Sequence, residues 1–267
     1  MCDSQPTRRD VLRNAGIAIG AAAVASALIG TDRSATAAPT VQAAPTVQPV
    51  EVMPGLSIHP RAYWGSDLPP RGHIAREDPK FLLVHHTASP NNYKNARDVM
   101  RTTYFWHTSN DPTKGWPDVA YEFFVGRDGD VYEGRAGALA GPVRADATGG
   151  NQGWAQLVCL LGDFTSVMPT AAAQASLVRV LAWLGDRYRI DTRPGAQVSI
   201  VSRGSQRWPN GTTVTSTTIA PHRDMSYTGC PGNTFSPMVA DLTTRVEAQR
   251  AAWANVMKPA VRLGPVP

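Results

Sequence analysis

The stretch that decides the fold is residues 121–133, which read YEFFVGRDGDVYE. Two apolar runs, 121–125 and 131–133, flank the polar turn sequence at 127–130. An Asp-Gly pair between two such runs is a strong signal for a β-hairpin, because glycine adopts the positive φ that tight hairpin turns require. This stretch therefore predicts two antiparallel strands that are neighbours in a sheet.

Other strands and helices are predicted on both sides of this hairpin. The short apolar runs at 81–84 (FLLV) and 157–161 (LVCLL) have the length of buried strands. Residues 95–107 and 170–188 have helical periodicity, and a last helix is expected at about 236–253. A second hairpin is predicted near 198–214, with its turn at Pro209-Asn210-Gly211. Since helices and strands alternate, we expect an α/β (α+β) single domain with a mixed central β-sheet flanked by helices.

The N-terminal residues 1–37 have the layout of an export signal. They contain TRRDVLR at 7–13, a mild apolar run at 15–30 and the small residues ATA at 35–37. This order is typical of a cleaved twin-arginine signal, and an uncleaved anchor is the alternative. The prediction is export by the twin-arginine route to the periplasm, cell wall or exterior of a bacterium.

The remaining boundaries follow from composition. The unit APTVQ occurs twice in 38–56, and such proline-rich repetition predicts a linker. The packed domain is predicted over 57–255, followed by a tail at 256–267. No segment after the signal has enough consecutive apolar residues to span a bilayer, so no stable membrane span is expected once the signal is cleaved.

Composition also excludes several classes of protein. The 267 residues carry 26 Lys and Arg against 21 Asp and Glu, a net charge of +5 without a basic run. A nucleic-acid-binding protein would need a basic stripe, so this class is excluded. Three cysteines cannot form a disulfide framework, which excludes a small disulfide-stapled domain. We expect a monomer.

Three residues have the chemistry of zinc ligands. His85 directly follows the apolar run 81–84, and His222 and Cys230 lie eight residues apart in a later segment. Catalytic zinc sites take three protein ligands and leave a fourth position for water, and two histidines with one cysteine fit that number. A single histidine after a strand is more often a hydrogen-bonded structural residue, so spacing alone does not distinguish a ligand from a structural histidine.

Six motifs occur together in this chain. They are PRAYWG at 60–65, HHTA at 85–88, DVAY at 118–121, GRDGDVYEGR at 126–135, HRD at 222–224 and TGCPG at 228–232. In this order, over roughly residues 60–250, the chain resembles the N-acetylmuramoyl-L-alanine amidases of the type-2 amidase and peptidoglycan-recognition-protein superfamily.

The resemblance implies a Zn²⁺ ion held by His85, His222 and Cys230 in a cleft on one face of the sheet. It also implies that the partner is peptidoglycan or its muropeptides. The implied reaction is hydrolysis of the amide between the lactyl group of N-acetylmuramic acid and L-alanine of the stem peptide. Tyr121 matches the family's catalytic tyrosine, and Thr228 occupies a position that suits support of the carbonyl or oxyanion. Each residue also has a purely structural interpretation, Tyr121 as a core residue and Thr228 as a residue that forms a turn.

Two other functions stay open beside the amidase. One is a non-catalytic peptidoglycan-binding protein, and the other is a zinc hydrolase of different cell-wall or peptide amides. Within the resemblance, members that only recognise peptidoglycan commonly lack the cysteine ligand. The retained Cys230 therefore favours an enzyme.

The remaining histidines and cysteines receive structural interpretations. His86 would point to the opposite face from His85 and is expected to be structural or to support a ligand. We expect His59, His73 and His107 at the surface or in loops. Cys159 is expected to be a buried apolar residue, with a Cys159–Cys230 disulfide as the alternative that would remove the third ligand.

Two further questions are left open by the sequence. Asp224 has the chemistry either to bond locally or to orient His222. Trp64, Trp116 and Trp154 are suited either to stacking on sugars or to packing in the domain.

Overall fold

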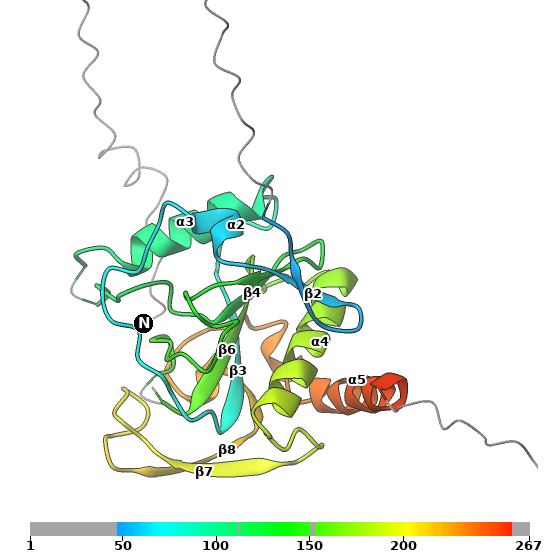
Figure 1. Ribbon diagram of the computed structural model, residues 1–267. Helices are drawn as coiled ribbons and strands as arrows, with labels where there is room; N and C mark the ends of the chain where they lie inside the picture. Colours follow the sequence, from blue (N-terminus) through cyan, green and yellow to red (C-terminus); the bar gives the residue numbers. More distant parts are fainter. Residues whose placement is uncertain (1–46, 112, 150–152, 258–267) are drawn as a thin grey trace, which may run out of the picture. The chain divides into compact units, whose positions relative to one another are not determined.

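The computed structural model describes residues 47–111, 113–149 and 153–257. Over these residues the main sheet has seven strands in the order β1-β2-β5-β4-β6-β3-β9. Figure 1 labels four of them, β2, β4, β6 and β3. Their bounds are β1 Val50–Met53, β2 Leu56–His59, β3 Phe81–His86, β4 Phe123–Val125, β5 Val131–Glu133, β6 Ala155–Leu160 and β9 Ile219–Pro221. The predicted signal at 1–37 lies outside the described residues.

The sheet is mixed, as the sequence predicts. β2 with β5, β4 with β6, β6 with β3, and β3 with β9 are parallel pairs, whereas β1 with β2 and β4 with β5 are antiparallel. The hairpin predicted from residues 121–133 is confirmed as β4 and β5, with Gly129 at φ +94° in its turn. Tyr121 lies just before β4 rather than inside it.

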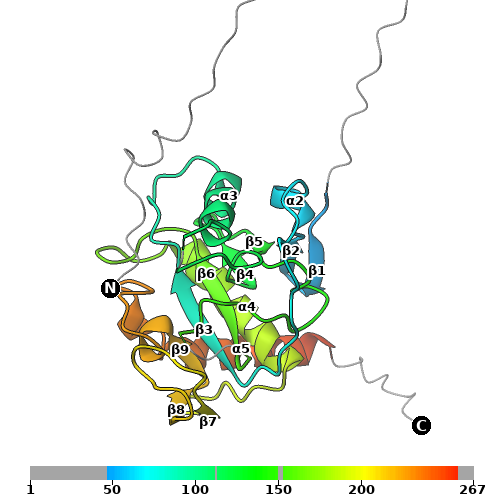
Figure 2. The ribbon, with the colours of Figure 1, turned by 90° about the vertical axis from the view of Figure 1, so that its left-hand side faces the viewer.

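Helices cover both faces of this sheet (Figure 2). One core cluster joins α4 (Ala171–Arg187) to the sheet residues Leu82 and Val158, and α5 (Leu242–Met257) packs on α4. The other cluster joins Trp64 of α2 (Ala62–Gly65) and Met100 of α3 (Ala96–His107) to the opposite face. The expectation of a mixed sheet flanked by helices is therefore confirmed.

Capping side chains fix where the two predicted helices begin. Asn95 accepts a hydrogen bond from Arg97 N at 3.0 Å, and Thr170 accepts one from Ala173 N at 3.1 Å. A side-chain oxygen at this position satisfies an N–H group that has no partner within the helix. The starts of α3 and α4 therefore lie within one residue of the prediction.

A separate two-stranded antiparallel sheet consists of β7 (Gln197–Val201) and β8 (Thr213–Thr217). This is the predicted second hairpin, and residues 202–212 connect its strands. Only Thr218 separates β8 from β9, so the hairpin leads directly into the main sheet.

The linker predicted over 38–56 is wrong in its described part. Residues Val50–Met53 form β1, which turns through Pro54 and Gly55 and pairs antiparallel with β2. Gly55 has φ +73°, which suits the second central position of a Pro-Gly turn. The proline-rich repeat before β1 hid the alternation of a strand only four residues long.

The last helix and the tail also differ from the prediction. Pro237 lies in a short 3₁₀ turn, η2 (Ser236–Met238), and α5 begins only at Leu242 and extends to Met257, past the predicted tail boundary at 256. Trp253 Nε1 donates to Pro54 O at 2.9 Å, which ties α5 to the β1–β2 turn. None of the helices in the described ranges is both long and apolar enough to cross a membrane.

Candidate metal centre and active site

Two parallel strands deliver the two candidate histidine ligands to the same edge of the sheet. β3 pairs with β9 in the register Leu82↔Ile219 and Val84↔Pro221. His85 lies in β3, and His222 is the first residue after β9. Because parallel strands end at the same edge, the two imidazole rings lie together, with centroids 4.3 Å apart.

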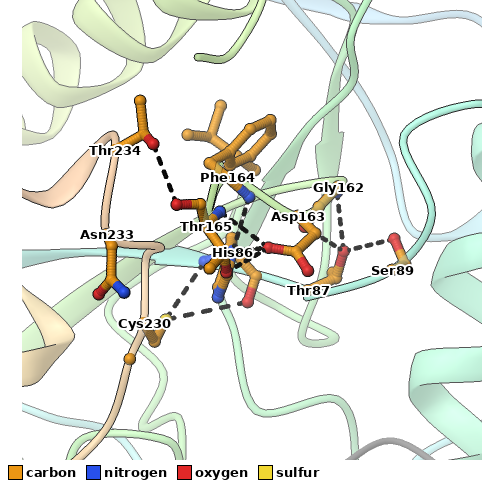
Figure 3. Close-up of polar contacts among 12 residues, drawn as sticks. His86, Thr87, Ser89, Gly162, Asp163, Phe164, Thr165, Cys230, Asn233 and Thr234 are labelled. Carbon is orange, nitrogen blue, oxygen red and sulfur yellow. Dashed lines mark hydrogen bonds and ion pairs between the residues drawn. The ribbon is translucent and has the colours of Figure 1, made fainter. Parts of the chain in front are cut away.

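Cys230 reaches the same place from the segment 222–230. Its Sγ atom lies 3.6 Å from His85 Nδ1, and His86 N donates to this Sγ at 3.4 Å (Figure 3). Arg223 N also donates to Cys230 O at 3.1 Å, which closes the segment into a loop. The structure thus brings together all three residues predicted to bind a metal.

The geometry and chemistry of this cluster fit zinc. One donor atom from each of His85, His222 and Cys230 lies within 4.8 Å of the others. On a tetrahedral ion, Zn–S and Zn–N bonds of about 2.3 and 2.0–2.1 Å place sulfur and nitrogen about 3.5 Å apart, close to the distance found between Cys230 and His85. Two imidazoles and a thiol are the donor set that zinc prefers.

Burial determines the charge of His85. Its side chain is fully buried, and desolvation lowers its pKa well below the ordinary value, with a further lowering from His222. The imidazole is therefore neutral near pH 7. A neutral imidazole has the lone pair that a metal bond requires.

Tyr121 lies beside this cluster. Its ring centroid is 5.1 Å from that of His85 and 5.3 Å from that of His107. It also hydrogen-bonds Cys159, whose thiol pKa is raised well above its usual range by burial and only partly lowered by Tyr121. Tyr121 is buried at 8 % exposure and belongs to the core cluster. The structure thus gives it a packing role and places it next to a candidate ligand.

Thr228 has a local structural contact. Its hydroxyl accepts a hydrogen bond from Cys230 N at 3.2 Å, as the turn-forming reading expects. The same residue lines an open hollow of about 370 Å³ together with Arg207, Arg223 and Asp224. Its side chain is thus positioned both to hold the cysteine and to face solvent.

His86 lies away from the metal cluster, as predicted. Its Nδ1 accepts a hydrogen bond from Phe164 N at 3.3 Å, and it faces Asp163 at 3.8 Å (Figure 3). Burial lowers its pKa to about 4 although Asp163 opposes this. Its contact with the cluster is made by its backbone N–H group.

The prediction that His59, His73 and His107 lie at the surface or in loops is wrong for His107 and only partly right for His59. His107 is 1 % exposed at the end of α3, and its Nδ1 accepts from Ala120 N at 3.0 Å. It continues the buried helix face of Met100 and Tyr104, and this spacing could have predicted its burial. His59 ends β2 and stacks on Tyr132, whereas His73 is exposed as expected.

The two cysteines of the domain are separate thiols, so the alternative disulfide does not form. Cys159 is fully buried in the core cluster, as predicted. The thiol of Cys230, the third candidate ligand, is therefore not consumed by a disulfide bond.

The residues left open by the sequence have structural contacts. Trp64 is fully buried and donates from Nε1 to Glu133 O at 2.7 Å. Trp154 Nε1 donates to Val201 O at 3.1 Å. Trp116 is half-buried against His107. The backbone oxygen of Asp224 accepts from Trp208.

Two buried ion pairs were missed by the sequence analysis. Arg135, in the motif GRDGDVYEGR, is 1 % exposed and pairs with Asp146. Arg61 pairs with Asp118 at 2.9 Å. A charged residue inside a motif gives no sign of burial by itself, because most arginines are exposed.

Comparison with known proteins gives the family. Residues 75–233 match the family described as N-acetylmuramoyl-L-alanine amidase. The human protein named N-acetylmuramoyl-L-alanine amidase is 37% identical over 124 residues, which are 44% of this chain and 20% of that protein. Peptidoglycan-recognition protein LE of Drosophila melanogaster is 32% identical over 120 residues, 44% of this chain and 33% of that protein. The chain spans only about a fifth of the human relative's length.

Solved structures show the same fold. Drosophila peptidoglycan recognition protein SD superposes with a TM-score of 0.51 at 20% identity, over 68% of this chain and 92% of that one. Peptidoglycan recognition protein LE in complex with tracheal cytotoxin gives 0.51 at 23% identity, over 69% and 92%. The chain belongs to the N-acetylmuramoyl-L-alanine amidase family, within the superfamily that includes the peptidoglycan-recognition proteins.

Proposed function

We propose that this chain is an exported, zinc-dependent N-acetylmuramoyl-L-alanine amidase that cleaves peptidoglycan between the lactyl group and L-alanine. The observation that carries the proposal is the cluster of His85, His222 and Cys230, whose donor atoms all lie within 4.8 Å. The family match over residues 75–233 supports the reaction class. Export rests on the sequence of residues 1–37.

In this proposal the three clustered residues hold the ion. A zinc ion bound there would lower the pKa of a coordinated water molecule to roughly 7 and would polarise the scissile carbonyl. His85 contributes a neutral imidazole whose position is fixed by β3. Cys230 contributes a sulfur that also accepts the His86 N–H group, and a hydrogen bond of this kind stabilises a thiolate.

Tyr121 and Thr228 are assigned to the reacting carbonyl. The phenol of Tyr121, beside His85, would donate a hydrogen bond to the oxygen that becomes negative as the amide is attacked. The Thr228 hydroxyl, fixed near Cys230, would support the same oxygen from the side of the hollow. Both groups are already held in place before substrate binds, which limits reorganisation during the reaction.

The test is to incubate the protein beginning at Ala38 with peptidoglycan and to identify the products by mass spectrometry. Wild type, Cys230→Ser and His222→Ala are each incubated once with added zinc and once with a chelator. The exposed loop residue His73 provides a matched control, His73→Ala. We expect free stem peptides that begin at L-alanine from wild type and the control, and none with the chelator or either ligand variant.

Two outcomes would contradict the proposal. Intact muropeptides together with tight pelleting on the cell wall would make the chain a recognition protein, as several of its relatives are named. Zinc-dependent cleavage at a different peptide bond would make it a hydrolase of another cell-wall amide.

A further inference from the structure

The segment that carries two of the three candidate ligands has little regular structure of its own. Its 3₁₀ turn, η1 (His222–Asp224), is three residues long, and most side chains in 222–230 are only half-buried. Internal backbone bonds run from Met225 N and Ser226 N to His222 O, at 2.9 and 3.2 Å. β9 places His222 at the edge of the sheet, but a turn this short does not by itself fix the backbone that follows this residue.

Contacts that fix this backbone come from the loop 202–212 that connects β7 and β8. Trp208 Nε1 donates to the carbonyl oxygen of residue 224 at 2.8 Å, and Ser205 Oγ donates to that of residue 225 at 3.0 Å. Arg207 Nη1 donates to the carbonyl oxygen of residue 223. Three consecutive carbonyls directly after His222 are thus held by three side chains, Ser205, Arg207 and Trp208, which we call the clamp.

The clamp is itself well ordered by hydrogen bonds. Ser205 N donates to Trp208 O at 2.8 Å, and Trp208 N donates back to Ser205 Oγ at 2.9 Å. Ser202 Oγ also donates to Trp208 O at 2.9 Å. Ile200 of β7, Val214 of β8 and Met225 belong to the same core cluster. The hairpin therefore forms a stable base from which the clamp contacts the ligand segment.

We propose that Ser205, Arg207 and Trp208 are positioning residues that set the metal affinity of the site by fixing the backbone after His222. This inference rests on the proposed zinc-dependent function. Groups that orient metal ligands without touching the metal change metal affinity by about 10–100-fold when they are removed. The clamp acts in this way through backbone carbonyls rather than through the imidazole itself.

The hairpin offers a matched control for a merely structural effect. Trp154 Nε1 also donates to the hairpin, at Val201 O, but it makes this bond at the end of β7 and not to residues 223–225. Trp154→Phe and Trp208→Phe each remove one indole donor and keep an aromatic ring. Only Trp208→Phe removes a bond to the ligand segment.

The experiment measures zinc dissociation constants by competition with a chromophoric chelator for wild type, Trp208→Phe, Ser205→Ala and Trp154→Phe. The absorption spectrum of the Co²⁺-substituted proteins and the melting temperature of the metal-free proteins are recorded in parallel. We expect zinc to bind about tenfold more weakly to Trp208→Phe and Ser205→Ala, with altered Co²⁺ bands. Trp154→Phe should keep the wild-type affinity and spectrum even where its melting temperature falls.

Wild-type zinc affinity and Co²⁺ bands in both clamp variants would overturn the inference. An equal loss of affinity in Trp154→Phe would also overturn it, because the effect would then follow hairpin stability. Failure of the proposed function is seen separately. If wild type binds zinc but releases no stem peptides, the amidase proposal fails, and the affinities still decide whether the clamp positions the ligand segment.

Discussion

β3 and the segment 222–230 each contribute candidate metal ligands, but they are held in place by different forces. β3 is buried along its whole length, and it lies between two parallel neighbours, β6 and β9. The segment 222–230 is mostly half-buried and is fixed by side chains that donate to its backbone oxygens. His85 is thus held within a strand of the sheet, whereas His222, which follows β9, and Cys230 also depend on local hydrogen bonds. Stability and metal binding should therefore respond differently to changes in the two regions.

The largest effect is expected from a change in β3. Leu83 is fully buried and lies in register with Leu157 and Ala220 on the neighbouring strands. Leu83→Ala should lower the free energy of unfolding by about 2–5 kcal/mol, because a buried cavity forms. Ser226→Ala, in the ligand segment, should change it by less than about 0.5 kcal/mol. Urea denaturation of the metal-free proteins measures the free energy of unfolding of both variants. An equal loss in the two variants would show that β3 and the segment 222–230 do not differ in their contribution to stability.

Tyr121→Phe tests the part of the site around His85, the ligand that lies in β3. The variant keeps the ring contact with His85 and removes only the hydroxyl. If this hydroxyl stabilises the developing oxyanion, kcat should fall about 100-fold with little change in KM or zinc affinity. Steady-state kinetics on a defined muropeptide would show this. A wild-type kcat would return Tyr121 to a purely packing role.

Glu77, in the loop before β3, should make stability depend on pH. Burial raises the pKa of Glu77 to about 8, although Arg144 opposes the shift. Since the folded protein holds this proton more tightly than the unfolded chain, the contribution of Glu77 to stability should fall as the pH rises from about 4.5 to about 8. One group contributes at most about 1.4 kcal/mol per pH unit within this window.

Glu77→Gln should remove this contribution, so the free energy of unfolding should change with pH less steeply downward in the variant than in wild type. The fully buried Glu122 also has a raised pKa, caused mainly by burial, and contributes in the same direction. The buried histidines, His85, His86 and His107, contribute in the opposite direction below about pH 6.5, because burial lowers their pKa values. Denaturation between pH 4.5 and 8.5 compares the slopes for wild type and variant. Parallel curves for the two proteins would show that Glu77 ionises normally in the folded state.

The smallest effect is expected from Thr228→Val. The change removes the hydroxyl that accepts a hydrogen bond from Cys230 N and keeps the branched shape of the side chain. If the hydroxyl also supports the reacting oxygen with a bond worth about 1 kcal/mol, kcat/KM should fall about fivefold. Thr228→Ser, which retains a hydroxyl, should recover most of this loss. If both variants match wild type, the hydroxyl supports neither the turn nor the reaction.

The sequence predicted the parts of the molecule that rest on repeating patterns. The apolar run at 81–84 and the Asp-Gly turn at 128–129 each indicate a local structure by themselves, and β3 and the β4–β5 hairpin follow. The grouping of His85, His222 and Cys230 came instead from the family's motifs. Periodicity alone could not bring together residues more than 130 positions apart.

The parts that were missed depend on contacts without a sequence pattern. β1 has only four residues and is recognisable through its partner β2. The clamp depends on side-chain donors that meet backbone carbonyls, and any residue provides such a carbonyl. The burial of Arg135 depends on its ion pair with Asp146, 11 positions further along the chain, and no periodic pattern marks this pairing.

X-ray absorption at the zinc edge tests the central claim most directly, because it reports the atoms bound to the metal. With one equivalent of zinc, the wild-type protein should show one sulfur at about 2.3 Å and nitrogen or oxygen neighbours at about 2.0–2.1 Å. Cys230→Ser should lose the sulfur. A wild-type spectrum without sulfur, or one that the Cys230→Ser substitution leaves unchanged, would contradict a site built from His85, His222 and Cys230.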